Sequence, residues 1–311
     1  MPACHILRTD EPNQVTGDSD YIDRTNRAID YVMRHLSGPV KLEDVARAAR
    51  FSPFHFHRVF KAQLGETLNQ FVRRQRIERA LYLMSHAPKR SLTEIALECG
   101  FASSSDFSRG FKQRFGVPPS GFDLRVFRDS RRAEFEALMS SQTDGPRLSR
   151  LPAGENPDGF KVELRRIPAR TVAYIRVLDP YQGTGVLDAY EKLLAWAEAH
   201  GLADGQWLGY MWEDPEIVAF KDCRYDAAVV VDDVVPEGEI GRFDFPAMRV
   251  AEVVLSGNIE LELRALDWLF GTWLPQSGFE PDDNPAFEAW RGRPFAHGLE
   301  HFELSCQLPI K

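Results

Sequence analysis

Four side chains within one short stretch have the types and the spacing of a surface that reads DNA bases. They are Phe54, His57, Arg58 and Lys61. These positions are i, i+3, i+4 and i+7, so a helix would place them on one face. Arginine can bond guanine O6 and N7, histidine can contact a base edge, and phenylalanine can meet a thymine methyl group. Ser52 is a good N-cap for this helix and a further candidate for contact with DNA. An ordinary solvated helix face is the alternative interpretation.

The same stretch belongs to an internal repeat. Residues 42–65 and 92–116 align with a shift of fifty positions, which becomes fifty-one after one inserted residue. Each copy reads as a short helix, a tight turn and a second helix, which is the helix-turn-helix pattern. Arg50 stands in the first turn where Gly100 stands in the second. Because a left-handed conformation costs a non-glycine residue ~1–2 kcal/mol, we expect the first turn to be either strained or differently shaped.

The second helix of the second copy carries small hydroxyls and cations at its outward positions. They are Ser105, Ser108, Arg109 and Lys112. Side chains of these kinds suit contact with the phosphate backbone better than discrimination between bases. We therefore expect the first copy to specify the DNA sequence and the second copy mainly to position the protein.

A helix predicted over residues 67–86 separates the two copies. Its apolar residues recur at close to the 3.6-residue period, which predicts one buried stripe, and Pro88 follows its expected end. About twenty residues at ~1.5 Å each give a rod of roughly 30 Å. Successive major grooves on one face of B-DNA are ~34–36 Å apart. The spacing therefore indicates that both units contact one face of a DNA duplex.

The charge of the chain differs between its two halves. The sequence has 311 residues, of which 43% are hydrophobic, and a net charge of −8. Residues 20–132 carry a net charge of +9, whereas the remainder carries −17. This asymmetry indicates that one half meets a polyanion and that the other does not.

Membrane and secretory classes are not expected. The sequence has no run of eighteen apolar residues, and its first residues lack the apolar core of a signal peptide. The four cysteines, at positions 4, 99, 223 and 306, show no metal-binding spacing. We expect a cytoplasmic protein with reduced thiols, without a metal or cofactor, and without contact with a membrane.

The chain divides into four segments. We predict a disordered tail, an all-α tandem helix-turn-helix domain, a linker and an α+β domain over residues 1–19, 20–139, 140–158 and 159–311. The last segment reads as strand-strand-helix-strand-strand, twice over. Trp196 with Gly201, and Trp273 with Gly278, mark this second duplication at a distance of 77 positions. Paired halves of this kind leave a crevice, which is a usual place for a ligand.

The first domain resembles the DNA-binding domain of AraC/XylS transcription regulators. The stretches SPFHFHRVFKAQLGETLNQFVRRQRIERA and SLTEIALECGFASSSDFSRGFKQRFGVPPSGF, in that order, carry the resemblance, which covers residues 20–127. In that family the first recognition helix reads bases. The resemblance implies base contacts by Phe54, His57 and Arg58, with Arg109 contacting DNA from the second unit.

The second domain resembles the GyrI-like effector-binding domain that follows a similar DNA-binding half in Rob-type regulators. The stretches VELRRIPARTVAYIRVLDPY, QWLGYMWEDPE, KDCRYDAAVVV and PAFEAWRGR carry the resemblance over residues 160–311. That family binds amphipathic, often cationic compounds in an aromatic crevice that holds a glutamate. The corresponding residue is Glu288, and a carboxylate among aromatic rings attracts a lipophilic cation. The candidate aromatic residues are Trp290, Trp212, Tyr210 and Tyr181.

Together these patterns predict a one-component transcription regulator that is not an enzyme. Its partners would be double-stranded DNA and a small cationic or amphipathic effector, with RNA polymerase as a further candidate. Two alternatives stay open at this point. Some GyrI-like proteins hydrolyse reactive small molecules, and the second domain in that case would be a hydrolase. The other alternative is a domain that binds a protein such as a topoisomerase.

Overall fold

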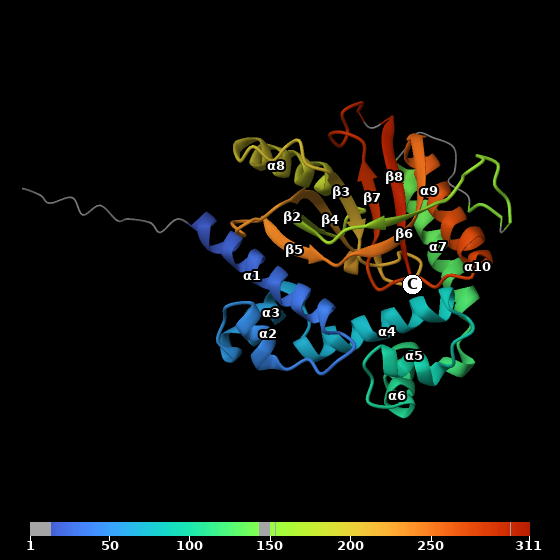
Figure 1. Ribbon diagram of the computed structural model, residues 1–311. Helices are drawn as coiled ribbons and strands as arrows, with labels where there is room; N and C mark the ends of the chain where they lie inside the picture. The colour runs from blue at the N-terminus through green and yellow to red at the C-terminus, as the bar shows by residue number, and fades with distance from the viewer. Residues whose placement is uncertain (1–13, 143–149, 153, 299) are drawn as a thin grey trace, which may run out of the picture.

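The computed structural model describes residues 14–142, 150–152, 154–298 and 300–311, and it places an all-α domain against a sheet domain (Figure 1). The helices of the first domain are α1 (Gln14–Arg34), α2 (Leu42–Ala48), α3 (Pro53–Leu64), α4 (Leu68–His86), α5 (Leu92–Glu98), α6 (Ser104–Phe115), η1 (Pro119–Gly121, a 3₁₀ turn) and α7 (Leu124–Gln142).

The predicted ends of this domain need correction. Residues 14–19 are helical rather than part of a disordered tail, because no proline after Gln14 interrupts α1. The other part of that predicted tail, residues 1–13, lies outside the described residues. α7 likewise continues to Gln142, inside the segment predicted as a linker. Residues 143–149 of that segment also lie outside the described residues.

The two helix-turn-helix units occur where the repeat predicts them. α2 and α5 begin fifty positions apart and α3 and α6 begin fifty-one apart, so the inserted residue lies just before the second helix. Arg50 has a φ of 55° and Gly100 a φ of 84°, so both turns are left-handed. The first turn is therefore strained rather than differently shaped. Arg24 donates a hydrogen bond to the Arg50 carbonyl oxygen at 2.7 Å.

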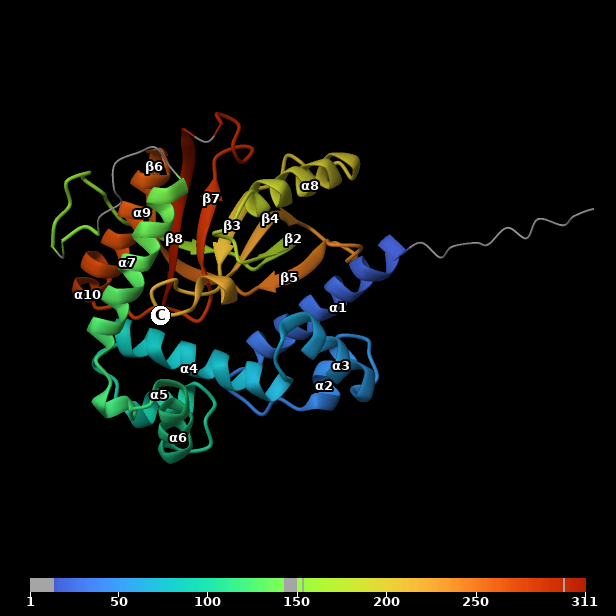
Figure 2. The same ribbon diagram turned by 180° about the vertical axis from the view of Figure 1, so that it is seen from behind.

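α4 joins the two units and is buried on more than one face. Thr67 and Gln70 form a capping box at its start, and the helix ends at His86. Gln75 and Glu78 are buried although they lie outside the predicted apolar stripe, so the prediction of a single buried face is wrong. The reason is tertiary, because the two units lie on one side of α4 and the sheet domain lies on the other (Figures 1 and 2).

The second domain has the predicted duplicated order of strands and helices. Its strands are β1 (Glu163–Ile167), β2 (Arg170–Leu178), β3 (Trp207–Met211), β4 (Arg224–Val231), β5 (Gly241–Phe245), β6 (Met248–Gly257), β7 (Ala286–Trp290) and β8 (Phe302–Ile310). Its helices are α8 (Gly185–Ala199), η2 (Phe220–Asp222), α9 (Ile259–Trp268), η3 (Leu269–Trp273, a π-helical turn) and α10 (Leu274–Ser277).

The strands form one antiparallel sheet in the order β1-β6-β8-β7-β3-β4-β2-β5. The first repeat supplies β1 to β4 and the second supplies β5 to β8. The first strand of each repeat pairs with a strand of the other repeat: β1 pairs with β6, and β5 pairs with β2. β3 and β7 join the repeats at the centre, where Gly209 lies opposite Glu288.

The sheet is strongly curved. Ile167 ends β1 and Arg170 begins β2, and three residues span at most ~11 Å. In a flat sheet the six strand spacings between β1 and β2, at about 4.8 Å each, would separate them by roughly 29 Å. Phe245 and Met248 make the same short connection between β5 and β6. The two edges therefore curl toward each other and give the sheet a concave and a convex face.

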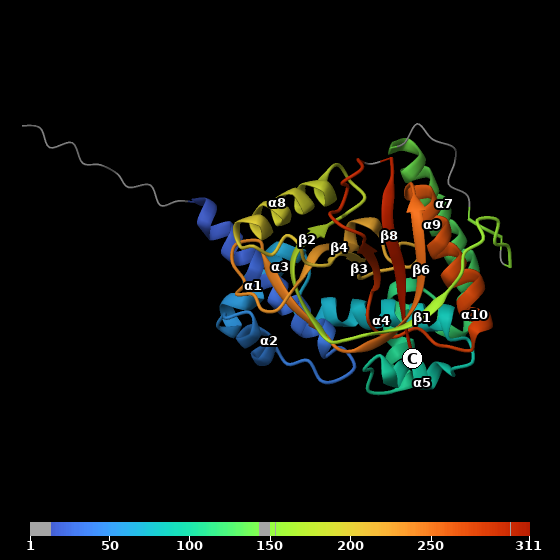
Figure 3. The same cartoon turned by 45° about the horizontal axis from the view of Figure 1, so that its top comes forward.

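The two faces have different covers. α8 and α9 pack their apolar side chains on the convex face (Figure 3). The concave face holds an aromatic cluster of Tyr174, Tyr210, Phe243, Phe245 and Phe287. α1 and α4 of the first domain close one end of this concave face (Figure 1). None of the helices in the described ranges is long and apolar enough to cross a bilayer.

Candidate DNA-binding face and effector pocket

α3 presents the predicted base-reading face to solvent. Phe56 and Phe60 are buried on its inner side, so the outward side is fixed by packing. Ser52 caps the helix by accepting a hydrogen bond from the His55 backbone nitrogen at 3.4 Å. Phe54 is 78% exposed, which is unusual for a phenylalanine that only serves folding. The other three predicted base readers on this helix are exposed as well: His57, Arg58 and Lys61.

α6 occupies the same place in the second unit with a different surface. Ser105, Arg109 and Lys112 are exposed, whereas Ser108 is half-buried. The guanidinium of Arg109 lies 3.5 Å from Asp106, one turn earlier on the helix. Sequence reasoning missed this carboxylate, although a spacing of three residues places the two side chains together. Asp106 reduces the positive charge of α6 and so supports a smaller part in base reading for this helix.

The arginines of α4 serve the fold rather than an open basic surface. Arg76 donates to the Leu36 carbonyl oxygen at 3.0 Å, and Arg74 contacts Glu66 and Glu78 at 2.5 and 3.2 Å. Arg114 of α6 reaches the same Glu78 at 2.9 Å. Burial raises the pKa of Glu78 to about 7, against the opposite effect of the two arginines. These arginines are therefore bound to groups of their own domain and do not form an open basic surface.

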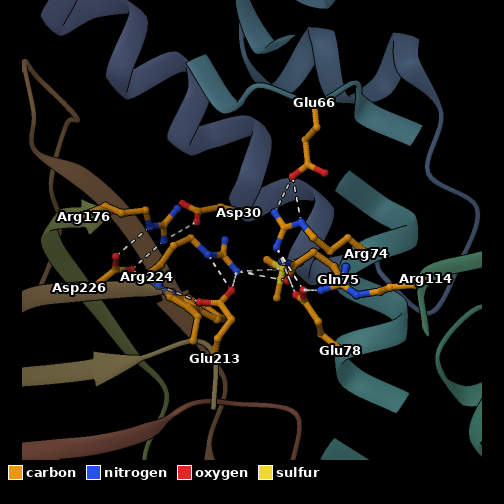
Figure 4. Close-up of polar contacts among 12 residues, drawn as sticks. Asp30, Glu66, Arg74, Gln75, Glu78, Arg114, Arg176, Glu213, Arg224 and Asp226 are labelled. Atoms are coloured by element: carbon orange, nitrogen blue, oxygen red, sulfur yellow. Dashed lines mark hydrogen bonds and ion pairs between the residues drawn. The ribbon is translucent and has the colours of Figure 1, made fainter. Parts of the chain in front are cut away.

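A buried ion-pair network attaches α1 to the concave face of the sheet (Figure 4). Arg176 on β2 forms a bidentate pair with Asp226 on β4, with nitrogen–oxygen distances of 2.7 and 2.8 Å. The same guanidinium lies 2.9 Å from Asp30 on α1, and Tyr174 donates to that carboxylate at 2.6 Å. Burial raises the pKa of Asp30, and the charge of Asp226 adds to the effect, whereas Arg176 opposes it.

A second buried network attaches α4 to the same region. Arg224 on β4 contacts Glu213 through its side chain at 2.8 Å and through its backbone nitrogen at 2.9 Å. It also donates to the Gln75 side chain on α4 at 3.3 Å (Figure 4). On the far side of the molecule, Arg132 of α7 forms a bidentate pair with Asp267 of α9 at 2.7 and 2.8 Å. Both repeats of the sheet domain are therefore in contact with the first domain.

Glu288 lies on the convex face among aromatic side chains from both repeats. Tyr225 on β4 donates to the Glu288 carboxylate at 2.5 Å. Tyr190 on α8 lies 3.0 Å from the Tyr225 hydroxyl and accepts a hydrogen bond from the Trp290 indole at 3.1 Å. Gly209 leaves the room for this arrangement, because a Cβ there would fall 2.4 Å from the Glu288 carboxylate.

A second carboxyl group, Glu262 on α9, is hydrogen-bonded to Glu288. Its side chain is only 3% exposed. Burial raises the pKa of both residues, and the like charge of Glu288 raises that of Glu262 further. The pair therefore holds a proton more tightly than two separate glutamates do. Nothing in the sequence pattern singles out Glu262, because a glutamate in the first turn of a helix ordinarily faces solvent.

The structure does not bring all five predicted effector residues together. Trp290 lies beside Glu288, since alternate residues of β7 share a face. Tyr210 and Trp212 lie on the concave face, opposite to Glu288, and Trp212 donates to Asp226 at 2.8 Å. The expectation that these two residues line one crevice with Glu288 is wrong, because the pairing of Gly209 with Glu288 turns Tyr210 to the other side.

Tyr181 lies in neither place. Its ring packs against Phe135 of α7 and Phe220, and its hydroxyl contacts the Met211 sulfur at 2.9 Å. This position is at the junction between α7 and the sheet domain. Sequence reasoning did not select Tyr225, which contacts Glu288, or Tyr190, which contacts the Tyr225 hydroxyl.

Two family models match separate parts of the chain. Residues 45–125 match the model described as a helix-turn-helix domain, and residues 160–311 match that described as a GyrI-like small molecule binding domain. The solved DNA-binding domain of AdpA in complex with a target DNA is similar at 25% identity, over 35% of this chain and 97% of that one, with a TM-score of 0.32.

Curated relatives match the first domain. The regulatory protein PocR of Salmonella typhimurium is 33% identical over 121 residues, which are 39% of this chain and 40% of that protein. The uncharacterized HTH-type transcriptional regulator YbfP of Bacillus subtilis is 28% identical over 146 residues, 47% of this chain and 48% of that protein. The chain thus matches less than half of the length of these two relatives.

Proposed function

The chain joins an AraC-type helix-turn-helix domain to a GyrI-like domain, and from this premise we propose that it is a transcription regulator that senses a small amphipathic cation. α3 reads bases with Phe54, His57 and Arg58, and Ser52 and Lys61 add contacts at its ends. α6 binds the backbone through Ser105, Ser108, Arg109 and Lys112. The exposure of both helices on the side of α4 away from the sheet domain supports this part of the proposal.

The effector site is the carboxyl pair of Glu288 and Glu262 on the convex face. A lipophilic cation replaces the shared proton as the counter-charge of the pair, while Trp290, Tyr190 and Tyr225 supply ring faces and edges. The single observation that carries this assignment is the location of two mutually hydrogen-bonded carboxyl groups among these rings. Burying like charges side by side is costly, so a bound cation is stabilised there relative to water.

β4 connects the effector site to the DNA-binding half. Tyr225 and Asp226 are neighbours in sequence and therefore point to opposite faces of the sheet. Tyr225 donates to Glu288, and Asp226 holds Arg176, which in turn contacts Asp30 on α1. A ligand that displaces the Tyr225 hydroxyl thus acts on the strand that fixes α1. Coupling requires that the ligand bind one arrangement of the two domains better than the other.

The test combines footprinting with titration. We expect the full chain to protect an asymmetric DNA site with two contacted segments about one helical turn apart, because one chain carries both units. Adding phenyltrimethylammonium should change the DNA affinity, whereas tert-butylbenzene, its neutral isostere, should not. A single protected patch or an obligatory palindrome argues against the DNA part. Turnover of the added compound, rather than saturable binding, would assign the domain to a hydrolase instead.

A further inference from the structure

A cavity of about 480 Å³ opens on the concave face, at the end opposite to the contacts with α1. This volume is within the range of small-molecule sites. Its apolar walls come from Ile167 and Pro168 in the β1–β2 turn, Val230 on β4 and Ala289 on β7. None of its lining residues belongs to the DNA-binding half, and Glu288 and Glu262 do not line it. Trp290 of β7 lines both this cavity and the effector site, whereas the carboxyl pair of that site lies on the convex face.

Arg170 supplies the cavity with a cation that has no carboxylate partner among the described residues. Its Nε and Nη2 are buried without a hydrogen-bond acceptor, and the guanidinium lies 4.3 Å from the centre of the Phe287 ring. Burial lowers the pKa of Arg170 to about 10, which still leaves it charged at neutral pH. A buried guanidinium without an anion is costly, because it has lost water and gained only a ring contact.

Two other charged groups of the cavity, Glu252 and Arg165, are already paired. Glu252 accepts from Arg165 at 2.8 Å and from the Gln307 side chain at 2.9 Å, so it is not free to neutralise Arg170. Arg165 also lies 3.3 Å from Glu163. The Gln307 side-chain oxygen is buried without a donor, and Ser305 adds a hydroxyl to the wall. The cavity thus combines apolar walls with the buried, uncompensated charge of Arg170 and the exposed cation of Arg291.

We propose that this cavity binds a small organic carboxylate with a flat apolar body, and that Arg170 is its counter-ion. The carboxylate accepts hydrogen bonds from the guanidinium, for which planar carboxylates are the natural bidentate partner. The apolar body contacts Ala289 and the β1–β2 turn, and a hydroxyl or NH group on it can donate to Gln307. The second domain then has two sites of opposite charge preference on the two faces of one sheet.

The experiment is calorimetric titration of the full chain with 2-naphthoate and with 2-naphthamide, its neutral counterpart. We expect 2-naphthoate to bind and 2-naphthamide to bind at least about tenfold more weakly, the effect of losing one hydrogen bond to a charged group. Arg170→Gln should weaken 2-naphthoate by about 10- to 100-fold. Ala289→Leu keeps the charge but fills the cavity, and it should abolish binding of both compounds. Arg166→Gln is the matched control, since Arg166 is exposed and alternates to the other face of β1.

The results can distinguish failure of this carboxylate-site proposal from failure of the proposed cation site. Saturating phenyltrimethylammonium should leave a 2-naphthoate site available, and failure of the cation to bind would leave the carboxylate result unaffected. Thermal unfolding of each variant shows whether it folds, and the comparison of the two compounds on the wild-type chain needs no variant. Equal affinity for 2-naphthoate and 2-naphthamide, unchanged binding in both cavity variants, or an equal loss in Arg166→Gln would overturn the proposal.

Discussion

Replacing Glu288 by glutamine should reduce the affinity for a lipophilic cation while leaving a neutral compound of the same shape nearly unaffected. Opposite charges ~4 Å apart at an effective dielectric constant of ~20 attract by ~4 kcal/mol before desolvation is subtracted. Aromatic contacts with Trp290 and the tyrosines remain, so we expect a net loss of about one to two powers of ten in Kd, or ~1.4–2.8 kcal/mol. The measurement is titration with phenyltrimethylammonium and tert-butylbenzene.

Glu262→Gln is the matched control, because Glu262 holds the proton of the pair more tightly and Glu288 is the carboxylate that carries the charge. Removing Glu288 leaves Glu262 buried, and its raised pKa keeps it neutral, so the site loses its whole charge. Removing Glu262 instead leaves the Glu288 carboxyl and its hydrogen bond from Tyr225 in place, so the cation keeps its counter-charge and most of its affinity. Cation binding to the wild type should release a proton, which calorimetry in buffers of different ionisation enthalpy detects. In Glu262→Gln that release should be smaller, because only one carboxyl group of the pair remains.

The sign of the pH dependence follows from the same pair. Because burial raises the pKa of both carboxyls, protonated forms persist above the range of ordinary glutamates, and the cation competes with those protons. Affinity should therefore rise with pH above the range in which ordinary glutamates titrate in the wild type, and rise less steeply in Glu262→Gln, where one carboxyl group remains. Equal losses for the cation and the neutral compound in Glu288→Gln would show that Glu288 only packs. An unchanged cation affinity would refute the counter-charge role.

Three further perturbations test the DNA-binding half. Arg58→Ala should remove the preference at one base position, a discrimination of ~1–3 kcal/mol. Lys112→Ala should instead weaken binding to all DNA sequences alike and lower by about one the slope of log affinity against log salt concentration. Identical behaviour of the two variants in binding titrations would contradict the division of roles between α3 and α6. Arg176→Met should lower the free energy of unfolding by about 3–5 kcal/mol in denaturant titrations, because Asp30 and Asp226 lose their shared cation. An unchanged free energy of unfolding would mean that the protein does not need this network for stability. Arg50→Gly should stabilise it by about 0.5–1 kcal/mol, since the strain of φ 55° exceeds the entropy cost of glycine; a lower unfolding midpoint would argue against strain in that turn.

Local signals were sufficient to predict the helix-turn-helix units from the sequence. The Ser52 cap predicts the start of α3, and the repeat predicts a matching helix, α6, at the end of the second copy, since each of these signals acts over a few residues. The burial of Gln75 and Glu78 was not predictable, because it arises from contact with a domain more than a hundred residues away.

The proposed effector site could be predicted from the sequence only in part. Alternation along β3 and β7 tells which residues share a face within each strand, but not which face of one strand matches which face of the other. The register that places Gly209 opposite Glu288 decides this, and it moves Tyr210 and Trp212 to the concave side. Glu262 comes from a different element again and approaches Glu288 only because α9 crosses the convex face. Pairing between strands and helices far apart in the sequence therefore determines which side chains surround Glu288.

The buried ion pairs between the two domains affect how a bound effector could change the position of the DNA-binding half. A switch requires two arrangements that differ by only a few kcal/mol, so that ligand binding can select between them. Buried ion pairs meet this condition, because the attraction between the charges and the cost of removing them from water nearly cancel. The pair nevertheless forms only when the two side chains are placed within hydrogen-bonding distance of each other. The bridge from Asp226 through Arg176 to Asp30 thus specifies one docking of α1 at little net free energy. A ligand at Glu288 competes for the Tyr225 hydroxyl one residue away on β4, so a modest binding free energy is enough to bias that docking.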